Sequence, residues 1–580
     1  INPIHNTRQA EHSLLVWCKS AMLNAQAEQP YYDYLRNSWK ESFGATNNDM
    51  QAFWDKCLHD GVFEAAATTE NLNFTGNLGN AASKIKPSAG SNLEVAITEN
   101  IGIGAGQYAN NPWLQEIPEP VSRCAWGNYV GVPISFDGDR RFISFEDIKE
   151  DGTIVDLTLN NQKLQLGAIK QFGTMPGTVS VALGYGRKNG GVCGTGIGTD
   201  VYPFLTTDEN GHTQYYIENA DLKQAGIGLE KSFACVQHHH TLGVKAIEKS
   251  SGKMINADEA ALIDDAFKPL TKGYQGSLTD RTILKTSTIS ELKEKIEELY
   301  KKRHDAQKLN NNTLYPSYEY QYNAGHHWGM HVDLNACIGC SACAVACVAE
   351  NNVPMVGKRE VSRHHEMTWL RIDRYYYGNV DNPNVVYQPM MCQHCTNAPC
   401  ENVCPVNATN HSSEGLNQMA YNRCVGTRYC ANNCPFKVRR FNWYDYTQTD
   451  LFPGNSKMMA GETDTPYYGE NLIRMVLNPD VTVRTRGVIE KCSFCVQRIQ
   501  ESKLNAKRES RPLMANEVKT ACQTACPTGA ITFGDMNNEN SHLAKNLKNP
   551  LNYILLEEIG VRPVVNYTMK VTNRDESIEA

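Results

Sequence analysis

The sequence predicts an α+β chain made of two unlike halves. Short segments in which apolar and polar residues alternate crowd the stretch from about residue 121 to residue 244. Fifteen of the 20 cysteines lie between Cys337 and Cys526. A helical pattern lies between these two regions. The length of 580 residues corresponds to about three or four domains of ordinary size.

The composition narrows the class of protein. The 56 Lys and Arg against 63 Asp and Glu give a net charge of −7, whereas a nucleic-acid binder usually has a basic excess. No run of about 18 apolar residues is visible, so we expect membrane contact only through partner subunits. The segment Ile1–Trp17 has the character of internal sequence, and we therefore expect that an N-terminal portion is missing.

The first 120 residues are predicted to be mainly helix and loop. Tyr31–Trp39 and Asp49–Phe63 have apolar residues at mixed helical spacing. The segment Asn71–Gly90 is rich in Gly, Asn and Ser, a composition typical of surface loops.

The next region is predicted to be a β-barrel-like domain. Ile154–Leu159 alternates with period two, and Thr178–Leu183 follows a Pro-Gly turn. Gly190–Gly198 is a glycine-rich loop, and residues 245–286 are polar and irregular.

One helix is predicted between the halves, at about residues 288–308. Thr288 and Glu291 form a capping-box pattern, and four apolar residues follow at helical spacing. These are Ile289, Leu292, Ile296 and Leu299. Basic residues at 301–303 suit the negative end of the helix dipole. The helix is expected to connect the halves.

Four groups of cysteines define the second half. They are Cys337-x2-Cys340-x2-Cys343-x3-Cys347, Cys392-x2-Cys395-x4-Cys400-x3-Cys404-Pro405, Cys424-x5-Cys430-x3-Cys434-Pro435, and Cys492-x2-Cys495 followed by Cys522-x3-Cys526-Pro527. Three thiolates in a C-x2-C-x2-C loop can hold three corners of a cubane, while a fourth, three residues later, ligates the neighbouring cluster. Zinc is the alternative, but only the last group has the two separated pairs that zinc sites favour. The spacing therefore predicts iron–sulfur clusters.

Cross-ligation gives four sites if the first group pairs with the fourth and the second with the third. Site 1 is Cys337, Cys340, Cys343 and Cys526; site 2 is Cys347, Cys492, Cys495 and Cys522; site 3 is Cys392, Cys395, Cys400 and Cys434; site 4 is Cys404, Cys424 and Cys430. The first three are predicted to hold [4Fe–4S] clusters.

Site 4 lacks one thiol because Thr427 stands where the motif would place a cysteine. A threonine hydroxyl keeps its proton near neutral pH and is a poor ligand for the soft irons of a cluster. We therefore expect a [3Fe–4S] cluster at site 4. The alternative is that Thr427, a water molecule or a partner group holds a fourth iron.

These motifs resemble the four-cluster ferredoxin subunits of the molybdopterin oxidoreductase superfamily, such as those of dimethyl sulfoxide, polysulfide and nitrate reductases. The resemblance extends to Cys337–Cys347, Cys392–Cys400 and Lys491–Arg498. In that family the clusters connect a catalytic subunit with a quinone subunit in the membrane.

The first half resembles the late part of a molybdopterin oxidoreductase large subunit, whose C-terminal domain is a double-psi β-barrel. The similar segments are Asn111–Pro120, Gly173–Arg187 and Val201–Phe204. A fusion of such a domain with a four-cluster ferredoxin domain resembles the iron–sulfur subunit of bacterial alternative complex III, in which the large domain is a relic without molybdenum cofactor. The resemblance implies domains at 1–247 and 325–560, a linker at 248–324 and a C-terminal tail at 561–580.

The resemblance also implies a function. Quinol would be oxidised in an integral membrane partner beside the [3Fe–4S] cluster, and electrons would pass to c-type cytochrome subunits and a terminal cytochrome oxidase. The complex would lie on the periplasmic face of the cytoplasmic membrane, and no catalytic residue is expected on this chain. The alternative is a molybdenum-dependent reductase or dehydrogenase fused to its iron–sulfur domain.

The remaining candidates have simpler explanations. Glycines between Gly184 and Gly198 do not fit a dinucleotide-binding loop and are interpreted as turn residues. His238–His240 are expected to be vestigial or structural, and the five early cysteines are expected to include ordinary buried thiols. Two histidine pairs and two aromatic clusters remain open between packing or surface roles and contacts with clusters or partners: His326–His327, His364–His365, Tyr375–Tyr377 and Trp443–Tyr446.

Overall fold

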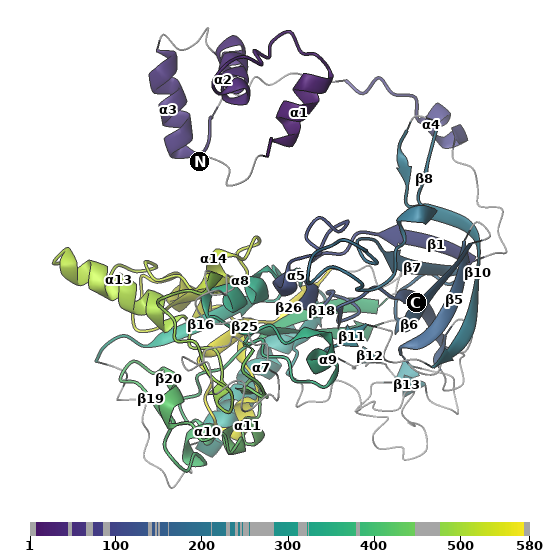
Figure 1. Ribbon diagram of the computed structural model, residues 1–580. Coiled ribbons are helices and arrows are strands. Elements are labelled where there is room, and N and C mark those ends of the chain that lie inside the picture. The colour runs from purple at the N-terminus through teal and green to yellow at the C-terminus, as the bar shows by residue number, and fades with distance from the viewer. Residues whose placement is uncertain are drawn as a thin grey trace, which may run out of the picture. The chain divides into compact units, whose positions relative to one another are not determined.

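The computed structural model divides into two compact units, Ile1–Pro87 and Ser88–Ala580 (Figure 1). It describes residues 7–43, 49–64, 73–84, 93–136, 142–144, 148, 151–159, 162–209, 211–227, 233–237, 242–243, 246–247, 254–255, 283–310, 322, 324–378, 383–446 and 476–573. The two units do not coincide with the predicted domain boundaries at 247, 324 and 560, which stay predictions.

The first unit is helical. It contains α1 (Ala10–Trp17), α2 (Pro30–Phe43), α3 (Met50–Asp60) and α4 (Leu78–Lys84). Helices α2 and α3 confirm the two predicted helical segments, and the Asp49 carboxylate caps α3 by accepting hydrogen bonds from Gln51 N and Ala52 N. Helix α4 corrects the prediction of a loop: Asn77 accepts a hydrogen bond from Asn80 N, so a polar residue of the supposed loop starts a helix.

The second unit begins with a closed barrel of six strands. In order around the barrel these are β3 (Val130–Phe136), β6 (Gln162–Gln171), β5 (Thr153–Leu159), β10 (Tyr216–Ile227), β1 (Leu93–Thr98) and β7 (Thr178–Ala182), and β7 pairs again with β3. The short β4 (Phe142–Ser144) pairs antiparallel with β3 at the edge of the sheet. Val95, Val130, Val155, Leu157 and Val179 fill the interior and are fully buried. The barrel confirms the predicted β-rich region.

Strand β1 corrects the prediction that residues 1–120 are mainly helix and loop. Leu93–Thr98 has alternating burial and lies between β10 and β7, antiparallel to the first and parallel to the second. The pattern covers only six residues, and the two strands that it joins come much later in the sequence. Local sequence therefore gives little sign of it.

Short elements surround the barrel. They are α5 (Pro112–Glu116), β2 (Cys124–Ala125), η3 (Tyr202–Phe204), β8 (Thr206–Thr207), β9 (Thr213–Gln214), β11 (Ala234–Cys235), β12 (Leu242–Gly243), β13 (Ala246–Ile247) and β14 (Met254–Ile255). The glycines between Gly184 and Gly198 lie in turns and bends, and no helix follows within the described residues 183–201. This confirms their interpretation as turn residues. His238–His240 lie outside the described residues.

The cysteine-rich half is built on a sheet ordered β23-β16-β25-β24. These strands are Ile531–Asp535, Trp328–Asp333, Val565–Thr568 and Asn552–Ile554. Its other elements are α8 (Ala342–Glu350), α9 (Gly357–Ser362), β17 (Arg371–Gly378), β18 (Pro383–Met390), α10 (Pro399–Asn402), β19 (Thr409–His411), β20 (Asn417–Met419), η6 (Tyr421–Arg423), α11 (Tyr429–Asn432), β21 (Arg440–Phe441), β22 (Ile489–Glu490), α13 (Val496–Arg508), α14 (Ala521–Thr524), α15 (His542–Leu547) and η9 (Glu557–Ile559).

The predicted linker and the predicted tail both take part in this half. Helix α7 (Leu292–Asn310) confirms the predicted helix, and Thr288 Oγ1 accepts a hydrogen bond from Glu291 N just before it. Strand β15 (Thr286–Thr288) pairs in parallel with β26 (Lys570–Thr572). Strand β25 is central in the sheet and residues between 561 and 569 are in the core, while β26 is half-buried and paired, so the prediction of a tail is corrected for 561–572. Residues 574–580 lie outside the described residues.

Backbone and side-chain contacts join the barrel to the cysteine-rich half. Strand β12 pairs in parallel with β17, and Gln237 exchanges two hydrogen bonds of 2.9 Å with the backbone of Arg374. The buried Glu116 carboxylate at the end of α5 accepts hydrogen bonds from Val356 N (3.0 Å) and Gly357 N (2.8 Å) at the start of α9. The barrel and the cysteine-rich half therefore fold against each other.

Candidate metal centres

Two cysteine loops have the same backbone conformation. In the loop 337–343, Gly339 has φ +72° and Ser341 has φ +64°; in the loop 424–430, Gly426 has φ +72° and Arg428 has φ +61°. A short helix follows each loop, α8 and α11 respectively. Thr427 therefore has the position in its loop that Cys340 has in the first.

Sites 1 and 2 each bring thiols together from distant segments. The Cys343 sulfur is an electrostatic neighbour of Cys337, Cys340 and Cys526. The Cys347 sulfur has Cys492, Cys495 and Cys522 as neighbours. Burial raises the pKa of Cys343 and of Cys347, and the surrounding sulfurs raise it further. Thiols gathered in this way stay protonated unless a metal displaces their protons.

Sites 3 and 4 repeat the arrangement in the other pair of motifs. The Cys395 sulfur lies beside Cys392, Cys400 and Cys434. Cys430 has Cys424 and Cys404 as neighbours, and a small hollow is lined by these three cysteines together with Thr427. Electrostatic contacts thus link the cysteines within each predicted group, and they also link neighbouring groups, as between Cys343 and Cys522. The four ligand sets stay a prediction.

The two Cys-Pro turns at Cys404 and Cys526 have matching hydrogen bonds. Each sulfur accepts one from the backbone N–H four residues later, Ala408 N at 3.1 Å and Ala530 N at 3.2 Å. Burial acts to raise the pKa of Cys404, but the backbone N–H groups around it outweigh burial and lower it. Such donors favour the thiolate, which is the form that binds a metal.

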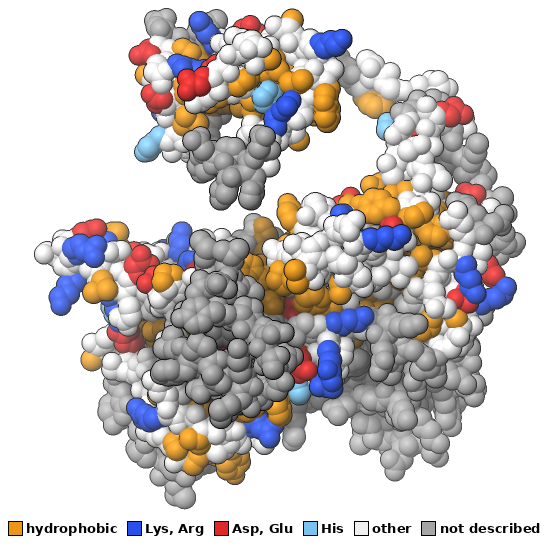
Figure 2. Space-filling model, in the orientation of Figure 1, with side chains coloured by type: hydrophobic (Ala, Val, Ile, Leu, Met, Phe, Trp, Pro, Cys, Tyr) orange, Lys and Arg blue, Asp and Glu red, His pale blue; other side chains and the backbone are white. Residues whose placement is uncertain are grey.

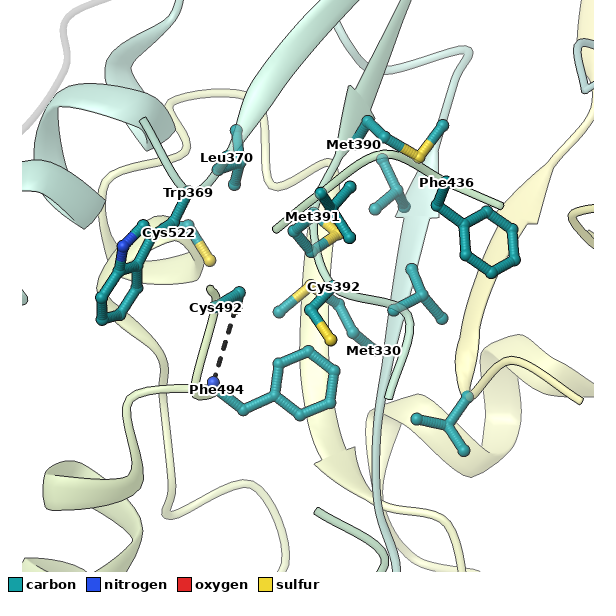
Figure 3. Packing of buried hydrophobic residues seen from close by; sticks show 14 of the residues in the cluster. Met330, Trp369, Leu370, Met390, Met391, Cys392, Phe436, Cys492, Phe494 and Cys522 are labelled. Atoms are coloured by element: carbon teal, nitrogen blue, oxygen red, sulfur yellow. Dashed lines mark hydrogen bonds between the residues drawn. The ribbon is translucent and has the colours of Figure 1, made fainter. Parts of the chain in front are cut away.

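Electrostatic contacts connect the four groups in the order of their numbers, and we call this series of sites the row. Cys343 of site 1 is a neighbour of Cys522 of site 2, and Cys492 of site 2 is a neighbour of Cys392 of site 3. The Arg439 guanidinium acts on both Cys400 of site 3 and Cys430 of site 4. Figure 3 shows Cys522, Cys492 and Cys392 among buried side chains, with Phe494 N donating to Cys492 Sγ at 3.4 Å.

The buried His394 ring offers a hydrogen-bond donor to a group bound between these cysteines. His394 Nδ1 accepts a hydrogen bond from Asn417 N at 3.1 Å, so the neutral ring carries its proton on Nε2. Burial and the charge of Lys491 hold the pKa of His394 well below its usual range, which keeps the ring neutral. In the part of the chain that the structure describes, Nε2 has no partner with good hydrogen-bond geometry, and only a weaker contact with the Cys492 backbone acts on the ring. A sulfide or thiolate of a bound cluster suits it, so these residues fit an iron–sulfur group.

The polar side chains nearest the thiols are not those that the sequence singles out. His326 and His365 bind Asp535 and Glu360 at 2.7 Å, and the His327 ring stacks on Tyr322. Side chains that do reach the sulfurs include Asn351, Asn417 and Arg439, with Lys491 close to Cys400. The hydroxyls of Thr520 and Thr528 also contact Cys522 and Cys526. Asn351 and Lys491 stand four residues after Cys347 and one before Cys492. Proximity to the motifs was the only signal that could have found them.

The two aromatic clusters differ in exposure. Tyr376 is buried against Phe172 of the barrel, and Tyr375 packs on the core, which supports a packing role. By contrast, Trp443 and Tyr444 are 40% and 47% exposed. The Trp443 ring stacks on His365 and lies 4.7 Å from the Arg428 guanidinium, next to Thr427. The Trp443 ring therefore lies at the surface beside the site 4 loop, and Tyr444 is the next residue along the chain.

The five early cysteines are in no predicted cluster motif. Cys124 and Cys235 are paired opposite each other in β2 and β11, and both thiols face the carbonyl of Ser122. Cys18 and Cys57 lie in the first unit, and Cys193 lies beside the barrel. Cys124 and Cys235 are the buried thiols among the five, as expected.

The surface carries charges of both signs. Basic and acidic side chains are intermixed on the face shown in Figure 2. Among the helices that the structure describes, none combines the length and the apolar character that crossing a bilayer requires.

Four cysteine motifs with ferredoxin spacing, whose sulfurs lie within electrostatic reach of one another, are typical of an iron–sulfur electron-transfer protein. Comparison with protein families supports this class: 4Fe-4S dicluster domains match residues 336–408 and 383–450. The chain therefore binds [4Fe–4S] clusters through its dicluster cysteine motifs, and the zinc alternative is not supported.

Curated relatives are similar to the same half of the chain. The iron–sulfur cluster-binding subunit of menaquinone reductase from Nitratidesulfovibrio vulgaris is 37% identical over 245 residues, which are 41% of this chain and 88% of that protein. Two others are 31% identical over 41% of this chain: the iron–sulfur subunit of a putative dimethyl sulfoxide reductase from Halobacterium salinarum (78% of its length) and the Hdr-like menaquinol oxidoreductase iron–sulfur subunit 1 of Archaeoglobus fulgidus (82%).

The chain belongs to the family of dicluster ferredoxin-like iron–sulfur subunits of molybdopterin and quinol oxidoreductase complexes. Its clusters transfer electrons within a multi-subunit respiratory oxidoreductase. The relatives cover 41% of this chain, so they describe the cysteine-rich half and not the barrel or the helical unit.

Proposed function

We propose that this chain is the iron–sulfur subunit of a quinol-oxidising respiratory complex of the alternative complex III type. Sites 1, 2 and 3 hold [4Fe–4S] clusters on the cysteines assigned to them, and site 4 holds a [3Fe–4S] cluster on Cys404, Cys424 and Cys430. The barrel corresponds to a relic large-subunit domain with a double-psi topology and no molybdenum cofactor. Two of the relatives are named for menaquinone or menaquinol, which supports a quinol-linked role.

The electron path follows from the row of sites. Quinol is oxidised in an integral membrane partner that docks beside site 4, and c-type cytochrome subunits carry the electrons towards a terminal oxidase. The chain itself lies on the periplasmic face of the membrane. The residues of this chain position the clusters and exclude water from them, and none performs acid–base chemistry.

The observation that carries this proposal is the character of site 4. It is at the end of the row, it has three thiols, and it is surrounded by exposed apolar side chains. Val425, Tyr429, Trp443 and Tyr444 are between 40% and 65% exposed. Large exposed apolar side chains clustered around one site mark a surface that a partner covers. We define these four residues as the site 4 rim.

Redox-poised, low-temperature EPR of the native complex tests the proposal. We expect an oxidised three-iron signal, [4Fe–4S] signals on reduction and no Mo(V) signal. A Mo(V) signal would show that the alternative is right, namely a molybdenum-dependent reductase or dehydrogenase fused to its iron–sulfur domain. Four-iron signals alone would be compatible with the electron-transfer role but would refute the three-thiol ligand set of site 4.

A further inference from the structure

Arg439 is a buried cation placed between two of the cysteine groups. It follows Cys434 by five residues, and its side chain is 6% exposed. Nη2 donates hydrogen bonds to Cys400 Sγ (2.9 Å), Thr409 Oγ1 (2.8 Å) and Asn417 Oδ1 (2.7 Å), and Nη1 donates to Met419 Sδ (3.2 Å). Among these four partners, none is a carboxylate.

The sulfurs around this guanidinium come from two sites. Cys400, Cys392 and Cys434 belong to site 3, and Cys430 belongs to site 4; each interacts favourably with the Arg439 charge. Cys404 of site 4 is also within its electrostatic reach. The guanidinium of Arg439 is thus a positive charge shared by sites 3 and 4, and its hydrogen bonds point at a sulfur instead of at an acid.

A charge in this position acts on electron transfer. Reduction adds one negative charge to a cluster, and a fixed cation in a buried environment stabilises the reduced form more than the oxidised form. Hydrogen bonds to the ligand sulfurs act in the same direction. A neighbouring carboxylate would cancel the effect, but the acid nearest in the contact network, Glu401, instead binds Asn417 and His411.

We propose that Arg439 is a positioning residue for electron transfer, which raises the reduction potentials of the clusters at sites 3 and 4 together and so keeps them matched. This inference rests on the proposed ligand sets of those two sites. It concerns a residue that binds neither iron nor quinol and that acts only through the sulfurs. A residue with a merely structural role would affect cluster content or stability, but not the potentials of two clusters selectively.

The test is a potentiometric EPR titration of the complex carrying Arg439→Gln, Arg439→Met or Arg439→Lys. In the two neutral variants we expect the reduction equilibrium constants of sites 3 and 4 to fall at least tenfold, which is about 59 mV for one electron. Sites 1 and 2 serve as internal references and should not move. Arg439→Lys keeps the charge and should restore most of the shift.

Arg440→Gln is the matched control. Arg440 is the next residue and is also largely buried, but it pairs with Glu366 at 2.9 Å and contacts no cysteine among its described hydrogen bonds. We expect the cluster reduction potentials in Arg440→Gln to equal those in the wild type. Unchanged potentials in Arg439→Gln with all clusters present would overturn the inference. Loss of the clusters at sites 3 and 4 from both neutral variants, with recovery in Arg439→Lys, would overturn it too, because Arg439 would then serve assembly.

Failure of the proposed function is visible separately in the wild type. A wild-type spectrum without a three-iron signal would refute the composition of site 4 before any variant is made. A normal wild-type spectrum together with unshifted variant potentials would refute only the role of Arg439.

Discussion

At the residue scale, the [3Fe–4S] cluster proposed for site 4 depends on Thr427. It has the loop position of Cys340, between a glycine with φ +72° and a residue with positive φ on the other side. We expect Thr427→Cys to supply the missing thiolate and to convert the [3Fe–4S] cluster into a [4Fe–4S] cluster. EPR of the oxidised variant would then lose the three-iron signal, and iron analysis would give one more iron per chain.

Thr427→Ser is the control for this substitution, because it changes the side chain but adds no soft ligand. Its spectrum should equal that of the wild type. An undiminished three-iron signal in Thr427→Cys would mean that the loop, despite its backbone, does not aim residue 427 at the cluster.

Cys124 and Cys235 provide the opposite case, buried cysteines for which we expect no cluster. Their thiols face the Ser122 carbonyl and lie in the barrel region. We expect Cys124→Ala to leave the iron and sulfide content unchanged and to cost about 1 kcal/mol of stability through lost packing. Cys395→Ala, at an equally buried position, should lose the cluster of site 3. Iron analysis of the two variants makes the comparison, and iron loss in Cys124→Ala would contradict the grouping.

The sequence predicted the four cysteine groups because ligand spacing is a local property of the chain. It could not predict Arg439, whose partners Thr409 and Asn417 are 30 and 22 residues away. Contacts of that kind depend on how the loops pack, and Arg439 carries no motif of its own. The histidine pairs were more conspicuous in the sequence, yet His326 and His365 bind carboxylates.

At the scale of elements, the loop before α11 depends on Gly426. A Cβ at this residue would lie 2.3 Å from the carbonyl oxygen of Gly487, and φ is +72°. Left-handed backbone alone costs an L-residue about 1–2 kcal/mol, and the clash with rigid backbone adds to it. We therefore expect Gly426→Ala to displace Cys424 and to lose the site 4 cluster selectively, as measured by the three-iron EPR signal.

Gly487→Ala separates the effect of left-handed backbone strain from the effect of the steric clash. Gly487 also has positive φ, +88°, but its Cβ would meet nothing within 4 Å. This variant should lose stability and keep the three-iron signal. Equal loss of the signal in both variants would attribute the effect to backbone strain and not to the contact with Gly487.

The contact between α5 and α9 predicts a pH dependence. Burial raises the pKa of Glu116 from 4.5 to about 7, although Gly357 N, Val356 N and Trp126 Nε1 donate to the carboxylate. Because the folded pKa lies above the unfolded value, the folded state binds the proton more tightly, and stability falls as the pH rises from about 4.5 to about 7. The loss amounts to about 3 kcal/mol over that interval.

Glu116→Gln removes this titration. The unfolding midpoints of wild type and variant are measured from about pH 5 to about pH 8. As the pH rises, the midpoint of the wild type should fall relative to that of the variant. Parallel curves would show that Glu116 keeps an ordinary pKa. The same comparison cancels the contribution of the cysteines, which both proteins share.

The barrel illustrates which elements local sequence predicts. The prediction recovered β5 and β7, whose alternation is long or follows a clear turn, and α7, whose cap is visible in the sequence. It missed β1, which is short and is held by strands far away in the sequence. It also missed β25, which is short and pairs with the distant β16 as well as with the nearby β24. Pairing partners, not propensity, make these two segments into strands.

At the scale of the whole molecule, the proposed docking of a membrane partner at the site 4 end can be tested with surface charges. Val425 is 65% exposed and stands beside Cys424, and Ile338 is 58% exposed at the equivalent position of the site 1 loop. If the membrane partner covers the site 4 rim, a charge at Val425 must be buried on docking without a partner, which is costly. The same charge at Ile338 should stay in water unless that end of the row is also covered.

We therefore expect Val425→Lys to slow the reduction of the clusters by quinol at least tenfold, while Ile338→Lys leaves that rate unchanged. Reduction by dithionite, which needs no docked partner, should be the same in both variants and in the wild type. Stopped-flow measurement of cluster bleaching with a quinol analogue in membranes gives the first rate, and dithionite gives the second. Slower reduction in Ile338→Lys alone would place the electron entry at site 1 and would reverse the direction of the row.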